Sequence, residues 1–284
     1  MPLAALILSS LTILAFAVSA AAEPPRRVVS INLCTDQLAV ALADASQIVA
    51  LSHLARIDGV SFLAGRAKAF PAVRGVAEEV LKLAPDVVLA GAFSSSATRA
   101  LLAAYGVKVE TFAPVTTVAE ARTEILRAAD VLGHPERGAE LVAEIDRALA
   151  DPAPASARPI LALQLQQRGF VSGRETLVAD VMGHLGIVNA ADRLGLTSVE
   201  RTPLEVVLRA QPDVLILHDE DSHPADQGAA LLSHPALAAA VPPARRAILP
   251  LGQITCAGPA LPAAISTLGR EIRRIRAAMT EAGK

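Results

Sequence analysis

Two cysteines carry the widest choice of chemistry in this chain. Cys34 and Cys256 each follow the end of a predicted buried strand, the edge of an α/β sheet where ligands bind. Such a pair can form a disulfide, contact a metal ion or remain as free thiols. A disulfide requires the two Cα atoms to lie within about 7 Å of each other. Neither cysteine lies in a motif that supplies an acid or base partner, so the sequence gives a thiol nucleophile no activating group.

Charged and aromatic side chains follow other predicted strands and could line a binding site. Arg56 and Arg168 carry planar guanidinium groups, which pair well with the carboxylates of an anionic ligand. His53 and His218 could donate hydrogen bonds or ligate a metal. A solvated surface position is the alternative for each of these four residues. The full set of candidate ligand-binding residues is Cys34, Thr35, His53, Arg56, Phe93, Arg168, Phe170, His218 and Cys256.

One acidic segment, residues 218–223 (HDEDSH), is rich in the residue types that ligate metals. Its spacing matches no structural zinc site, and an acidic loop of this kind is ordinarily solvated. We therefore predict no metal centre and no resident cofactor.

Composition narrows the class of partner. Lys and Arg number 26 against 28 Asp and Glu, a formal net charge of −2, so nothing favours a nucleic-acid partner. Aromatic residues make up only 2% of the 284 residues and Trp is absent, which leaves few side chains to stack on bases or sugars.

Predicted strands and helices alternate along the chain, which favours a parallel α/β sheet in each half. The predicted strands cover residues 27–33, 47–52, 86–90, 107–112, 159–165, 213–217 and 246–251. The predicted helices cover residues 35–43, 78–84, 98–105, 176–185 and 203–210, and a closing amphipathic helix begins near Leu261.

A sequence repeat relates the two halves. Residues 78–89 recur as residues 205–216, and six of the twelve positions are identical at a constant offset of 127. A unit of this length indicates two similar lobes, and two lobes usually enclose a cleft. Between them, residues 118–157 form a helical connector in which Pro135 starts a second, bridging helix. We predict an N-terminal α/β lobe at 23–117 and a C-terminal lobe at 158–284.

The first 22 residues have the pattern of a secretory signal peptide. An apolar run covers residues 3–17, and small residues follow it, with cleavage expected near Ala20 or Ala22. The alternative is an uncleaved membrane anchor. No cysteine lies near the cleavage site, which argues against a lipoprotein. Export would place both cysteines in an oxidising compartment.

Three features together resemble a known family. They are residues 27–30 (RVVS), the two Pro-Asp-Val strand starts at Pro85 and Pro212, and residues 170–176 (FVSGRET). This ordered set is similar to the periplasmic substrate-binding proteins of ABC importers for cobalamin and ferric siderophores. The resemblance implies two lobes bridged by one long helix, a metal chelate or corrinoid in the cleft, a permease partner, a monomer and no catalysis.

The same resemblance implies two permease-docking residues. Members of the family carry one exposed glutamate in each lobe, seven residues before the proline, and the matching positions here are Glu78 and Glu205. The repeat selects the same pair. The alternative is that both are ordinary first-turn helix glutamates, and Glu79 competes in the first lobe.

The chain departs from the family in its aromatic residues. Cobalamin and haem members commonly use Trp or Tyr in the cleft, whereas this chain has only Tyr105, at a helix end. The residue set therefore favours a polar or anionic ferric chelate over a flat macrocycle. The alternative functions are an exported cysteine-dependent enzyme and a ligand sensor of the same fold.

Overall fold

The N-terminal half folds around a parallel five-stranded sheet. The computed structural model describes residues 23–150, 158–218 and 232–282. The strand order is β3-β2-β1-β4-β5, so the chain starts in the middle of the sheet and builds outward on both sides. The strands are β1 (Val28–Ser30), β2 (Ile48–Ser52), β3 (Ala72–Val73), β4 (Val87–Gly91) and β5 (Lys108–Phe112). The accompanying helices are α1 (Leu33–Leu42), η1 (His53–Arg56), α2 (Ala64–Ala67), α3 (Ala77–Leu81) and α4 (Ser96–Ala104).

The C-terminal half contains a second parallel sheet, of four strands in the order β11-β10-β6-β8. A short antiparallel pair, β7 and β9, lies beside it. The strands are β6 (Ile160–Gln164), β7 (Phe170–Ser172), β8 (Ile187–Asn189), β9 (Val199–Arg201), β10 (Val214–Leu217) and β11 (Arg246–Ile248). The helices are η2 (Gln167–Gly169), α7 (Leu177–His184), η3 (Ala190–Leu194), α8 (Leu204–Arg209), α10 (Pro235–Ala240), η5 (Pro243–Arg245) and α11 (Leu251–Ile254).

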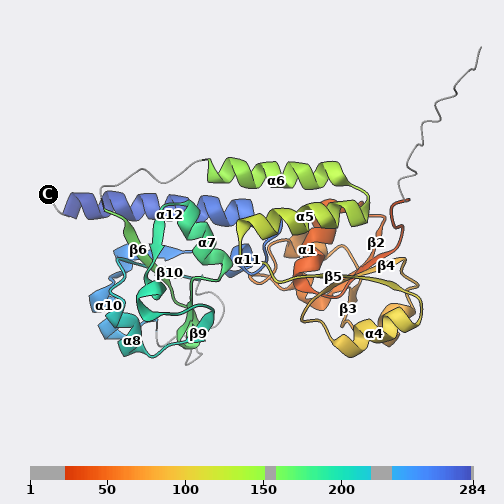
Figure 1. Ribbon diagram of the computed structural model, residues 1–284, viewed down its shortest axis with the longest axis horizontal. Helices are drawn as coiled ribbons and strands as arrows, with labels where there is room; N and C mark the ends of the chain where they lie inside the picture. Colours follow the sequence, from red (N-terminus) through yellow and green to blue (C-terminus); the bar gives the residue numbers. More distant parts are fainter. Residues whose placement is uncertain (1–22, 151–157, 219–231, 283–284) are drawn as a thin grey trace, which may run out of the picture.

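Three longer helices lie along the top of the molecule in Figure 1. They are α5 (Val118–Leu132), α6 (Pro135–Leu149) and α12 (Leu261–Ala282), with α5 over the N-terminal lobe and α12 over the C-terminal lobe. A capping box between Thr117 and Glu120 starts α5, and Gly133, with φ of 82°, ends it. Pro135 then occupies the first turn of α6, as predicted. Helix α6 runs from the N-terminal lobe toward the C-terminal lobe and packs against α12.

One apolar core runs beneath these helices and joins the lobes. A single buried cluster contains Val28 and Leu89 from the first sheet and Ile160 and Val214 from the second, and Ile145 of α6 belongs to it. Burial of this continuous surface opposes separation of the lobes. The prediction of two α/β lobes bridged by a helix is confirmed.

The repeat has a shared backbone geometry. Ala84 and Gln211 stand at equivalent positions, and their φ angles are 44° and 47°. The next two residues in each copy are Pro and Asp. Asp86 accepts hydrogen bonds from the backbone N–H groups of Arg26 and Arg27, at 2.8 and 2.9 Å. In the second copy Asp213 accepts one from Leu161, at 3.0 Å. Each aspartate thus fixes the start of the neighbouring central strand.

A segment of the second half crosses to the N-terminal lobe. A Cβ on Gly252 of α11 would lie 3.2 Å from the carbonyl oxygen of Gly59, and one on Gly258 would touch the side chain of Leu38. The chain therefore packs against the N-terminal lobe a second time before α12 begins.

Two sequence-based predictions lie outside the described residues, namely the signal peptide at 1–22 and most of the acidic segment, at 219–223. Within the described ranges, no helix is both long enough and apolar enough to cross a membrane.

Candidate ligand-binding cleft

A disulfide ties the N-terminal lobe to the segment that crosses over from the second half of the chain. Cys34, in the first turn of α1, is bonded to Cys256, which follows α11, and their Cα atoms are 5.2 Å apart. Of the alternatives that the sequence left open, the structure therefore contains the disulfide. Both cysteines of the chain are used in this bond, and neither thiol is free to act as a nucleophile or a metal ligand.

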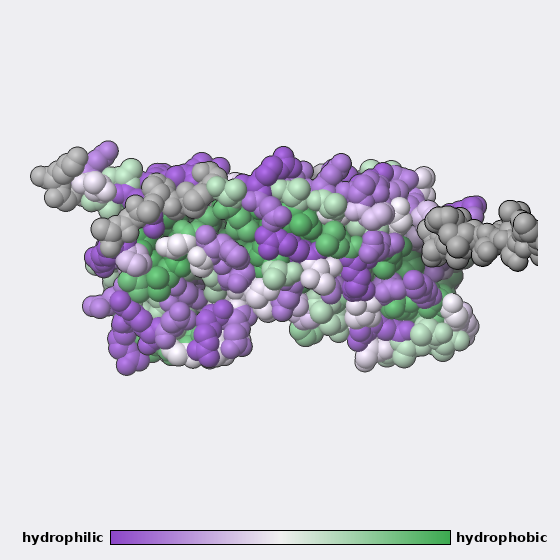
Figure 2. Space-filling model, turned by 45° about the horizontal axis from the view of Figure 1, so that its top comes forward, coloured by the Kyte–Doolittle hydropathy of each residue, from purple (hydrophilic) through white to green (hydrophobic). Residues whose placement is uncertain are grey.

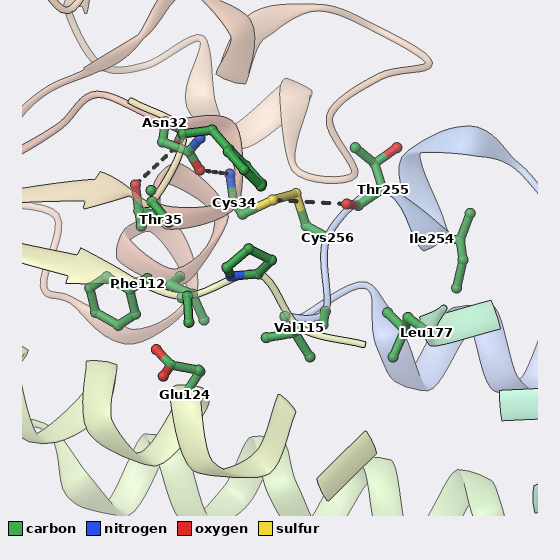
Figure 3. A pocket seen from close by; sticks show the side chains of 18 residues that line it. Asn32, Cys34, Thr35, Phe112, Val115, Glu124, Leu177, Ile254, Thr255 and Cys256 are labelled. Carbon is green, nitrogen blue, oxygen red and sulfur yellow. Dashed lines mark hydrogen bonds between the residues drawn. A yellow bond between two sulfur atoms is a disulfide. The ribbon is translucent and has the colours of Figure 1, made fainter. Parts of the chain in front are cut away.

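A cavity of about 280 Å³ lies beside this disulfide. It is bounded by the carboxyl ends of β1, β4 and β5 and by helices α5, α7 and α11 (Figure 3). Its walls are largely apolar, and the hydrophobic side chains that line it are Leu38, Phe93, Phe112, Pro114, Val115, Leu177 and Ile254. In the space-filling view the lower outline of the molecule is notched between the two lobes (Figure 2).

Buried polar groups fix the N-terminal wall of the cavity. Asn32 caps α1 by accepting a hydrogen bond from the backbone N–H of Cys34, at 2.9 Å. The Thr35 hydroxyl donates to the Asn32 carbonyl and lies 2.8 Å from the Ser30 hydroxyl, so it is satisfied within the wall. These bonds orient the first turn of α1, which carries Cys34.

Asp36 ties the same turn to the neighbouring strand. Ser52, at the end of β2, donates its backbone N–H at 3.0 Å and its hydroxyl to the Asp36 carboxylate. Burial raises the pKa of Asp36 to about 7, although the hydrogen bonds from Ser30 and Ser52 lower it. The carboxyl end of β2, and with it His53, is held against α1.

The predicted cationic residues do not line this cavity. Arg56 is half-buried, and its guanidinium donates to the carbonyl of Phe70 within the N-terminal lobe. His53 is exposed on η1. Arg168 is exposed in η2 with a left-handed φ of 62°, and its carbonyl accepts a hydrogen bond from Arg201.

His218 and Phe170 lie near the carboxyl edge of the second sheet, outside the cavity. His218 Nδ1 is 2.9 Å from the carbonyl oxygen of Leu249, so this nitrogen carries the proton and donates. Its Nε2 lies 3.5 Å from the side-chain nitrogen of Gln164. Phe170 opens β7 and is 37% exposed. Among the nine candidates, the structure brings Cys34, Thr35, Phe93 and Cys256 to one cavity.

Sequence reasoning missed one charged residue in this cavity, Glu124 of α5. Arg127 donates to its Oε2 from Nη2, at 2.9 Å, and also pairs with Glu110 at 3.2 Å. The same guanidinium lies over the ring of Phe112, 3.8 Å from its centroid. Glu124 lies in mid-helix and follows no strand, so the rule that selected strand ends could not find it.

The two predicted docking glutamates are exposed in the first turns of equivalent helices. Glu78 of α3 and Glu205 of α8 make no hydrogen bond or ion pair with the part of the chain that the structure describes. Glu79, the competitor, accepts a hydrogen bond from the backbone N–H of Arg74 at 2.7 Å. Between these two neighbours, Glu78 is therefore the one whose carboxylate makes no bond to the described chain.

Two lobes of parallel α/β structure, joined by α6 and enclosing a cleft, define a binding protein. The family profile of the periplasmic binding proteins matches residues 28–245, and the chain belongs to that family. The family and its solved relatives are binding proteins, so the chain is not an enzyme.

Solved structures with the same fold cover nearly the whole chain. The apo periplasmic haem-binding protein RhuT from Roseiflexus sp. RS-1 is 27% identical, with a TM-score of 0.71, over 88% of this chain and 98% of that one. The haem-binding protein BhuT, solved with two haems, is also 27% identical, with a TM-score of 0.72 and the same coverage. The vitamin B12-binding protein BtuF of Vibrio cholerae is 18% identical, with a TM-score of 0.68, over 89% of this chain and 98% of that one, and it shares the fold. No curated protein matches the sequence.

Proposed function

We propose that this chain is the substrate-binding component of an ABC importer and captures a metal-bound tetrapyrrole, haem or a corrinoid, between its lobes. The observation that carries this proposal is the apolar lining of the cavity beside the Cys34–Cys256 disulfide. A tetrapyrrole presents broad apolar ring faces, and burial of those faces against Phe93, Phe112 and Leu177 stabilises the complex.

This proposal revises the ligand expected from the sequence. An anionic ferric siderophore would be stabilised by cations in the cleft, yet Arg56 and Arg168 do not line the cavity. Phenylalanine and aliphatic side chains supply an apolar surface in this cavity, whose described lining contains no Trp or Tyr. The haem ligands named for RhuT and BhuT, the two relatives at 27% identity, support a tetrapyrrole.

Delivery would use one exposed glutamate on each lobe, near the rim of the cleft. Glu78 and Glu205 lie on separate lobes. Permease arginines could pair with both glutamates at once only when the lobes have the correct orientation and separation. We propose that the chain is exported by residues 1–22 and acts as a monomer. The alternative role as a sensor would use the same cleft and would differ in its membrane partner.

Calorimetric and absorbance titrations test the ligand class. The purified protein is titrated with haem, with cyanocobalamin and with ferrichrome as a ferric siderophore. At least one tetrapyrrole should bind with sub-micromolar Kd, a free energy of about −8 kcal/mol or better. Binding of ferrichrome alone would overturn the tetrapyrrole proposal. Uptake by vesicles that carry the cognate permease and ATPase separates an importer component from a sensor.

A further inference from the structure

A single charged side chain is found among the described residues that line the cavity. Among the described residues that line it, Glu124 is the only charged one, and no Arg, Lys or His is present. In Figure 3 its carboxylate points from α5 into the cavity, toward Phe112. The side chain is 20% exposed, so a ligand in the cavity would meet it with little intervening water.

Arg127 holds this carboxylate without offering a donor to the ligand. Its Nε and Nη2 bond to Glu124 Oε2, its Nη1 to Glu110, and its Nη2 also to the carbonyl of Thr111. The guanidinium lies over Phe112 and does not line the cavity. The second carboxylate oxygen, Glu124 Oε1, bonds to no described residue. The ligand therefore meets an acceptor oxygen held in a fixed orientation.

We infer, resting on the proposed function, that Glu124 determines which tetrapyrrole is bound, because its Oε1 accepts a hydrogen bond from an N–H on the ligand rim and disfavours a carboxylate there. A corrinoid carries amide side chains, which donate hydrogen bonds, whereas the haem rim carries two propionate carboxylates. An amide placed at Oε1 forms a charge-assisted bond. A propionate placed there meets a like charge and finds no cation in the cavity lining. The site thus selects an amide-rimmed ligand.

The test compares two ligands on one isosteric substitution. Glu124→Gln keeps the size of the side chain, and Arg127 keeps its bonds to Glu110 and Thr111. We expect the Kd for cyanocobalamin to rise about tenfold and the Kd for haem to fall about threefold, since a charged acceptor is lost and a like charge is removed. Glu124→Asp keeps the charge and should keep the discrimination against haem. Glu140→Gln, on the exposed face of α6, is the matched control and should change neither affinity.

Opposite changes in the Kd values for cyanocobalamin and haem would indicate selection between them, because damage to the fold would weaken the binding of both ligands. Parallel shifts, or no shift, in Glu124→Gln would overturn the inference and leave the proposed function standing. Tighter binding of haem than of cyanocobalamin by the unaltered protein would overturn it as well. Failure of the unaltered protein to bind either tetrapyrrole would overturn both the proposed function and this inference.

Discussion

Ala84 and Gln211, 127 residues apart, adopt the same left-handed backbone conformation immediately before a proline. This conformation is unfavourable for residues with a Cβ, so its presence in both lobes means that the turn geometry is retained by the surrounding structure. In each copy the turn sets the aspartate that bonds to the start of the central strand, at Asp86 and Asp213.

Glycine should relieve the strain at these two turns. Ala84→Gly and Gln211→Gly should each raise the free energy of unfolding by about 0.5–1 kcal/mol, because glycine adopts positive φ without a Cβ clash. Urea unfolding measures the change. Ala100→Gly, at an exposed position within α4, is the control and should lower stability by a similar amount. A loss of stability in all three variants would contradict the account of the turn.

The Asp36 carboxyl should make stability depend on pH. Burial raises its pKa to about 7 in the folded protein from the ordinary value of 3.8, so the folded state binds more protons between these two values. The contribution to stability is therefore greatest below about pH 4 and is lost as pH rises toward 7, with a slope of up to about 1.4 kcal/mol per pH unit.

Comparison with Asp36→Asn isolates this contribution. The asparagine can still accept from the Ser52 backbone N–H, and its amide can donate to the Ser52 hydroxyl, so the contacts to β2 are retained. Chemical unfolding from pH 4 to pH 8 should show a smaller decline in stability for the variant. Identical pH profiles for the two proteins would show that Asp36 has an ordinary pKa.

Removal of the disulfide should destabilise the protein strongly. The bond closes a span of 222 residues, so replacing both Cys34 and Cys256 by Ala should lower the free energy of unfolding by about 3–5 kcal/mol. Denaturant unfolding with and without a reductant measures the effect in the unaltered protein. The double variant is the control, since a reductant should leave it unchanged. Equal denaturant midpoints for the oxidised and the reduced protein would mean that the disulfide contributes little to stability.

The sequence predicts a helix or strand only where the residues of that segment themselves carry a clear pattern. The apolar runs that flank the two prolines predict strands β4 and β10. The helical spacing of apolar side chains predicts α12. The sequence does not predict the two-residue strand β3 or the three-residue strands β7, β8 and β9. A segment of two or three residues is too short to show an alternation of apolar and polar side chains.

The site was harder to predict because its walls come together only in the folded chain. The return of residues 251–258 to the N-terminal lobe decides that Cys256 meets Cys34, and no spacing in the sequence records that crossing. Likewise, Glu124 enters the cavity because α5 packs against α1 and α7, which also line it. Arg56 follows a strand, as the rule requires, but its guanidinium donates to the carbonyl of Phe70 and does not line the cavity.

The docking glutamates should act on transport and not on ligand binding. Glu78→Lys combined with Glu205→Lys should leave ligand affinity unchanged, because neither residue lines the cavity, and should abolish uptake, because like charges then meet at the permease. Ligand titration of the purified variant and uptake in vesicles with the cognate importer form the paired measurement. Glu140→Lys with Glu144→Lys, both exposed on α6, changes the charge equally and should transport normally. Normal uptake by the docking variant would sink the assignment.

The ligand that the protein carries in its own periplasm tests the central claim most directly. The chain is purified from the native periplasm without added ligand, and native mass spectrometry records the mass bound to it. We predict that this mass is that of a metal tetrapyrrole. The role inferred for Glu124 further predicts that the tetrapyrrole is a corrinoid and not haem. A ferric siderophore in the cleft would contradict the account.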